Sequence, residues 1–105
     1  MAIDYAGHCR LTVAEARMRI AEARQARPDW FDFPFRLTEP RALQNFDAEI
    51  AREFGIEAQS RFTLFVQDKE QLDGLEDALD YLYALFGPDN LVLTWGLDSI
   101  RQPRG

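Results

Sequence analysis

Residues 68–86 predict a helix with two contrasting faces, one of which must pack against the rest of the chain. Apolar side chains recur at three- and four-residue intervals, which is the spacing of one helical face: Leu72, Leu75, Leu79, Leu82 and Phe86. Carboxylates recur at the same spacing on the other side: Glu70, Asp73, Asp77 and Asp80. Between residues 66 and 100 there are eight Asp and Glu residues but one Lys. Because like charges on one face destabilise a helix, we expect this face to receive a basic partner.

Three interpretations of this carboxylate row remain open. A solvated outer face is the ordinary explanation of a charged helix. A calcium site would need the Asp-x-Asp-x-Asp-Gly loop of hard-cation sites, which the spacing of Asp73, Asp77 and Asp80 does not provide. A docking face for a basic protein is supported by the absence of lysines at the i+4 positions, which would neutralise a helix exposed only to water.

The docking interpretation predicts a set of partner-binding residues along and after this helix. Its charged members are Glu70, Asp73, Glu76, Asp77, Asp80 and Asp98. Large aromatic residues often anchor protein interfaces, and Tyr81 and Trp95 complete the set of eight. Tyr83 is a further aromatic residue near this region, and packing in the core or at its rim is the ordinary explanation for all three.

Alternating apolar and polar residues predict four strands, at residues 1–11, 30–37, 61–67 and 90–95. Three helices are expected between them, at residues 12–27, 43–54 and 68–86, and a Thr12–Glu15 capping box opens the first. Both faces of residues 61–67 are apolar, which is typical of a central strand covered by helices. Residues 96–105 are expected to fray.

The expected fold is a single α/β domain over residues 1–105, with the order β-α-β-α-β-α-β. Helical crossovers between strands favour a four-stranded sheet that is parallel or mixed, with the helices packed against it. At 105 residues and 47% apolar composition, the chain can bury one hydrophobic core.

Composition limits the classes of function. A net charge of −6 argues against nucleic acid as the direct ligand, because phosphate binding needs a basic surface. The first residues lack the basic start and apolar segment of a signal peptide, and no apolar run is long enough to span a bilayer. A single cysteine cannot form an internal disulfide. A reduced, cytoplasmic setting is therefore expected.

The sequence contains no recognisable catalytic, metal or cofactor motif. His8 and Cys9 are adjacent on a predicted strand, so their side chains point to opposite faces and cannot form a nucleophile–base pair. We expect Cys9 to pack as a small buried hydrophobe. Ser60 and Ser99 lack a nearby histidine and a nucleophile elbow. Enzymatic activity, metal binding and cofactor binding are not expected.

Several segments resemble immunity proteins of bacterial contact-dependent growth inhibition (CDI) systems, in the group whose toxins are tRNA-cleaving nucleases. The resemblance covers most of the chain at low identity and is greatest over residues 46–69. It rests on the opening Met-Ala-Ile-Asp, the cysteine-bearing strand, and the segments at residues 49–55, 60–62 and 68–69. It implies a cytoplasmic, non-enzymatic α/β protein that binds one toxin domain and blocks its active site. It assigns no individual binding residue.

Two functions therefore follow from the sequence and the resemblance. The first is an immunity protein, monomeric when free, that forms a 1:1 heterodimer with the basic surface of a nuclease toxin. The alternative is an acidic adaptor or regulatory domain that docks on another basic protein. A small enzyme using Asp and Glu pairs is a weaker third hypothesis.

Overall fold

The computed structural model describes residues 3–31, 35–43, 49, 51–53, 55–67, 74–95 and 99–101. Its strands are β1 (Ile3–Cys9), β2 (Phe35–Leu37), β3 (Arg41–Ala42), β4 (Ser60–Val66), β5 (Leu91–Trp95) and β6 (Ser99–Arg101). Its helices are α1 (Val13–Ala26), α2 (Pro28–Phe31) and α4 (Leu75–Phe86). Residues 49 and 51–53 are also helical, within the segment predicted as the second helix.

The strands form one six-stranded sheet in the order β2-β4-β1-β5-β6, with β3 also pairing with β4. Every pairing in this sheet is antiparallel. The prediction of a mixed α/β domain with helices packed on a sheet is confirmed. The predictions of four strands, of parallel or mixed pairing and of a strict β-α-β-α-β-α-β order are wrong.

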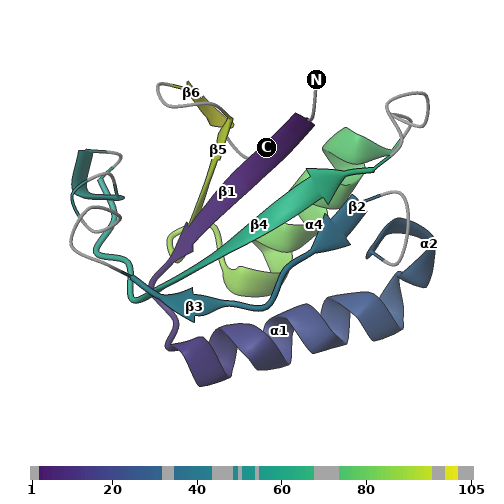
Figure 1. Ribbon diagram of the computed structural model, residues 1–105, viewed down its shortest axis with the longest axis horizontal. Coiled ribbons are helices and arrows are strands. Elements are labelled where there is room, and N and C mark those ends of the chain that lie inside the picture. Colours follow the sequence, from purple (N-terminus) through teal and green to yellow (C-terminus); the bar gives the residue numbers. More distant parts are fainter. Residues whose placement is uncertain are drawn as a thin grey trace.

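Two of the helical connections join strands that a third strand separates in the sheet, so the crossovers produce no parallel pair. β1 and β2 run in the same direction and are joined through α1 and α2, but β4 lies between them in the sheet (Figure 1). β4 and β5 are likewise joined through α4, with β1 between them. Each unit is therefore a split β-α-β unit. The helical crossovers expected from the sequence are present, but the strands that α1 with α2 and α4 connect are not neighbours in the sheet.

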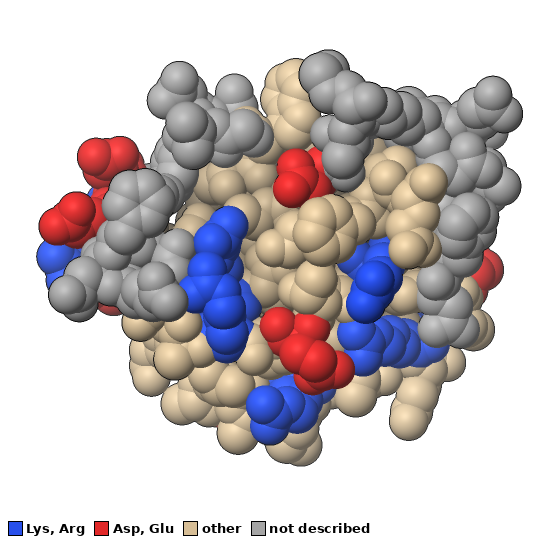
Figure 2. All heavy atoms as spheres, in the orientation of Figure 1, with Lys and Arg blue, Asp and Glu red and all other residues tan. Residues whose placement is uncertain are grey.

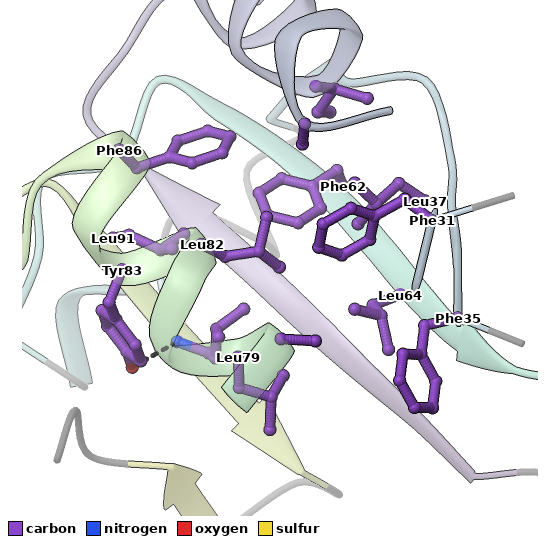
Figure 3. Close-up of a cluster of buried hydrophobic side chains, with 14 of the residues drawn as sticks. Phe31, Phe35, Leu37, Phe62, Leu64, Leu79, Leu82, Tyr83, Phe86 and Leu91 are labelled. Atoms are coloured by element: carbon purple, nitrogen blue, oxygen red, sulfur yellow. Dashed lines mark hydrogen bonds between the residues drawn. The ribbon is translucent and has the colours of Figure 1, made fainter. Parts of the chain in front are cut away.

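The hydrophobic core lies between one face of the sheet and the helices. Figure 3 shows Phe62 and Leu64 of β4 beside Leu79, Leu82 and Phe86 of α4. Ala16, Ile20 and Ala23 of α1 belong to the same cluster, so α1 and α4 cover the same sheet face. Phe65, which points to the other face of β4, is 37% exposed. The prediction that helices cover both faces of this strand is therefore wrong for Phe65.

The N-terminal third of the chain folds as its local signals predict. β1 alternates, with Cys9 buried on the core face and Asp4 exposed. Thr12 caps α1 through the predicted capping box, in which its side chain accepts from the Glu15 N–H and the Glu15 carboxylate accepts from the Thr12 N–H. Both signals can be read within a few residues of the sequence. The capping box forms within the first turn of α1, whereas β1 forms by pairing with β4 and β5.

Residues 30–37 do not form the single strand that was predicted. Trp30 and Phe31 complete the helical turn α2, and the strand β2 begins only at Phe35. Pro28 occupies the first position of α2, where its fixed φ and missing N–H are compatible with a helix. The apolar alternation arises because Phe31, Phe35 and Leu37 are all buried, although they belong to different elements.

Two corrections concern the C-terminal half. Gly74 precedes α4 with a left-handed φ of 87°, so α4 begins at Leu75 and the predicted helix does not continue through residue 74. Residues 68–73 of that prediction lie outside the described residues. Residues 99–101 form β6, which pairs with β5, although the segment from residue 96 was predicted to fray. The predicted stop of the helix at Gly87 is confirmed. None of the described helices has the length and apolar character that a membrane-spanning segment requires.

Candidate partner-binding surface

α4 separates its apolar and acidic residues onto two sides. The buried side packs on the sheet and comprises Leu75, Ala78, Leu79, Leu82, Tyr83 and Phe86. Glu76 and Asp77 are exposed, and Asp80 and Tyr81 are half-buried. Glu70, Asp73 and Asp98 lie outside the described residues. The structure thus brings four of the eight predicted binding residues together on one helix.

The carboxylates at the start of α4 have a local structural role as well. Glu76 and Asp77 lie in the first turn of the helix. Negative charge there interacts favourably with the unpaired N–H groups and the helix dipole, by about 0.3–1 kcal/mol per group at an exposed site. This effect offsets part of the repulsion expected for a row of carboxylates. The clustering of like charges is therefore not sufficient to show that a partner binds here.

A cation also lies near this acidic surface, which the sequence did not predict. Arg27 is the C-cap residue of α1, where its backbone N–H donates to the Ala23 carbonyl. Its side-chain Nε and Nη2 donate to the two carboxylate oxygens of Asp29 at 3.0 and 2.8 Å. The pKa of Arg27 is raised mainly by this hydrogen bonding, with smaller contributions from the charges of Asp29, Tyr81 and Asp77. The same contact lowers the pKa of Asp29.

The three predicted aromatic anchors have different environments. Tyr81 is half-buried against Trp30 and Phe31, with ring centroids 5.9 Å apart in both cases. Tyr83 is only 2% exposed, and its hydroxyl accepts from the Leu93 N–H at 2.9 Å, as the dashed line in Figure 3 shows. Tyr83 therefore belongs to the core, which was the alternative interpretation of this residue. Trp95 is 57% exposed but lies at the end of β5 and not on α4.

The opposite face of the molecule has a different charge. In Figure 1, α4 lies behind the sheet, so Figure 2 shows the face away from it, where basic side chains lie on both sides of an uncharged area and acidic side chains lie above and below it. The strand register places Arg36 beside Phe65 and Arg41 beside Arg61 on this side. Sequence reasoning missed this basic face because its arginines come from three short strands, whose pairing is not visible in the sequence.

Residues 1–99 match the family model described as the CDI system immunity component. The chain belongs to this family. No curated protein sequence gives a significant match. Among solved structures, the fold is similar to a chain of the CdiA-CT/CdiI toxin and immunity complex from Burkholderia pseudomallei. The two share a TM-score of 0.90 and 22% sequence identity, covering 96% of this chain and 98% of that chain.

This CDI immunity component keeps its reactive side chains inside the fold. Cys9 Sγ lies 2.8 Å from Ser60 Oγ, which in turn donates to the Leu11 carbonyl at 2.8 Å. Cys9 and Ser60 are fully buried, and His8 points to the other sheet face, opposite Arg61. The prediction of Cys9 as a buried hydrophobe is confirmed. Among the described residues, no group of three or more His, Cys, Asp or Glu side chains is placed to hold a metal ion.

We expect Cys9 to react with a thiol reagent orders of magnitude more slowly in the native protein than in urea. Burial raises the pKa of the Cys9 thiol, and the thiolate is the reactive form. Because the folded-state pKa is raised, stability should be constant below the unfolded pKa of about 8.5 and decrease as the pH rises above it. Reaction with a chromogenic disulfide reagent measures the first effect, and urea titrations between pH 7 and 10 measure the second. Equal rates in the native and unfolded protein would contradict the buried position.

Proposed function

We propose that this chain is the immunity protein that neutralises the toxin of its own CDI system. In this proposal it binds one toxin domain in the cytoplasm as a 1:1 heterodimer and covers the toxin's active site. The observation that carries the proposal is the family match over residues 1–99. The fold shared with a chain of a toxin and immunity complex supports it. The protein acts by binding and performs no chemistry of its own.

We further propose that the toxin is a nuclease, with tRNA as its substrate. A nuclease must present a basic cleft to the phosphate backbone of its substrate. Carboxylates arranged on a rigid helix can occupy such a cleft, and complementary charge increases the association rate and the specificity. Glu76, Asp77 and Asp80 of α4 form the described part of this acidic surface. Glu70, Asp73, Tyr81, Trp95 and Asp98 remain proposed members of the contact.

The adaptor hypothesis uses the same acidic helix to dock on another basic protein. It explains the charge of α4 equally well, but it lacks the support of the family match. Genetic context separates the two hypotheses. An immunity gene is expected directly after a reading frame for a large exported protein with a C-terminal toxin domain.

The decisive experiment expresses that C-terminal toxin domain from an inducible promoter, with and without this protein. Cells that contain only the toxin should stop growing, and cells that contain both should grow normally. A matched negative control is the same chain with Gly7→Val, which we expect to be unfolded. Growth arrest despite soluble, folded protein would refute the immunity function.

A purified system tests the finer part of the proposal. The toxin domain should cleave tRNA, and one molar equivalent of the protein should abolish cleavage. If the toxin instead damages DNA or membranes but is still neutralised, the immunity function stands and the tRNA assignment is wrong.

A further inference from the structure

An aromatic cluster joins α2 to the acidic helix α4. The ring of Trp30 meets Tyr81 edge-on at 5.9 Å between centroids and Phe31 at 6.0 Å. Phe31 is 1% exposed and belongs to the core, whereas Trp30 and Tyr81 are half-buried. A buried ring therefore supports two rings that reach the surface.

Contacts on several sides fix the position of Trp30. The Arg27 guanidinium lies over the indole, 3.4 Å from the ring centroid, and is itself held by Asp29. The indole Nε1 lies against the backbone before α4, since a Cβ at Gly74 would be 3.1 Å from it. A ring held in one place loses little conformational freedom when a partner binds, which favours affinity.

The surroundings of these rings are acidic. Asp77 lies one helical turn before Tyr81 on α4, and Asp80 directly precedes it. Asp29 forms a two-point ion pair with Arg27 and so neutralises much of its charge. Aromatic faces attract cations, and nearby carboxylates add to that attraction. Arg27 already makes such a contact with the indole, which shows that this ring accepts a guanidinium group. The cluster thus has the chemistry to receive a further positively charged side chain beside Tyr81.

We propose that Trp30 and Tyr81 form the anchor of the toxin contact and that they receive an arginine or lysine side chain of the toxin. This inference rests on the proposed immunity function and names the point on the surface where binding is strongest. Trp and Tyr dominate the energetics of many interfaces, particularly where less important contacts exclude water around them. Asp77 and Asp80 lie on the same helix as Tyr81, and in this proposal their carboxylates steer the basic toxin toward the anchor.

The test compares binding of the purified toxin domain to Trp30→Ala, Trp30→Phe and the unsubstituted protein by surface plasmon resonance. Trp30→Ala should raise the Kd about 30-fold or more, mainly through faster dissociation. Trp30→Phe retains an aromatic face and should recover most of the affinity. The matched control is Phe65→Ala, which removes an exposed ring from the opposite sheet face and should change the Kd less than about 3-fold. Circular dichroism confirms that each variant is folded before binding is measured.

A double-mutant cycle separates contact from structural support. Trp30→Ala is combined with substitution of each arginine and lysine on the toxin in turn. One toxin residue should show non-additive losses with Trp30→Ala, whereas a purely structural role predicts additive losses throughout.

The outcomes distinguish this inference from the proposed function. If the unsubstituted protein does not bind the toxin domain, the proposed function and the proposed anchor are both wrong. If the unsubstituted protein binds and folded Trp30→Ala binds equally well, only the anchor is wrong. A large loss with Phe65→Ala alone would place the contact on the sheet and overturn the anchor.

Discussion

Replacing Asp73, Asp77 and Asp80 together with Asn is expected to weaken toxin binding about 100-fold or more. A carboxylate that is desolvated against Arg or Lys costs about 2–5 kcal/mol when it is truncated, and carboxylates at the rim mainly accelerate association. Isothermal titration gives the affinity of the triple variant, and stopped-flow mixing gives its association rate. The association rate of the unsubstituted protein should fall as salt rises, because at 0.1 M salt exposed charges are screened over about 10 Å.

The matched control removes three carboxylates elsewhere and leaves the total charge the same as in the triple variant. Asp4, Glu22 and Glu57 are exposed and lie on β1, on α1 and before β4. Replacing them with Asn, Gln and Gln should slow association slightly but leave the dissociation rate unchanged. If both triple variants bind as tightly as the parent, α4 is only a solvated helix. The contact would then lie elsewhere, with residues 95–101 as the first candidate.

The triple variant should remain folded. Asp77 gains stability from the helix dipole, which Asn would reduce. Asp80 lies three and four residues from Asp77 and Glu76, so its neutralisation relieves repulsion. These opposing effects are each below about 1 kcal/mol at exposed sites. A loss of binding with an unchanged melting temperature would therefore report on the interface.

Sequence reasoning succeeded where the determining contacts are close in the chain. The Thr12–Glu15 capping box and the Gly87 stop require interactions within one or two turns. The carboxylates on the outer side of α4 follow from helical periodicity alone. These local patterns have the same structural effect whatever the rest of the fold is.

It failed where distant segments decide the outcome. The alternation around Trp30 fitted a strand, but packing of Phe31 in the core and Pro28 at a helix start favoured a turn of helix. The antiparallel insertion of β1 between β4 and β5 depends on pairings such as Gly7 with Phe62 and Leu93, which the sequence does not display. Trp30 and Arg27 were missed as site residues for the same reason.

Substituting Gly7 with valine is expected to unfold the protein or to leave it barely stable. Gly7 does not have the left-handed φ found at Gly55, Gly74 and Gly87. Its role is therefore to leave room for a neighbouring side chain. A Cβ there would lie 2.5–2.9 Å from the Phe62 ring atoms Cζ, Cε1 and Cε2. Phe62 is 2% exposed and stacks on Phe86 at 5.2 Å between centroids, so the ring has nowhere to move. Overpacking of this kind costs about 1–3 kcal/mol and sometimes more, in a domain whose total stability is about 5–15 kcal/mol.

The companion substitution Phe62→Leu tests the cause. Alone it should destabilise the protein, since it removes buried volume beside Phe86. Combined with Gly7→Ala it should restore part of the stability that Gly7→Ala loses, because the smaller side chain vacates the position that the new Cβ needs. Urea unfolding of the two single variants and the double variant gives the coupling, which should exceed about 0.5 kcal/mol for residues in contact.

Ala6→Val is the matched control on the same strand. Ala6 points to the other sheet face and is half-buried, so a β-branched side chain there should change stability by less than about 1 kcal/mol. If Gly7→Ala and Gly7→Val unfold at the same urea concentration as the parent, the close approach of Phe62 to β1 is wrong. If Phe62→Leu fails to rescue Gly7→Ala, the loss comes from another contact of β1. Suppose that Phe62→Leu restores stability to Gly7→Ala and that Ala6→Val leaves stability unchanged. The absence of a side chain at Gly7 is then what allows Phe62 of β4 to pack between β1 and Phe86 of α4.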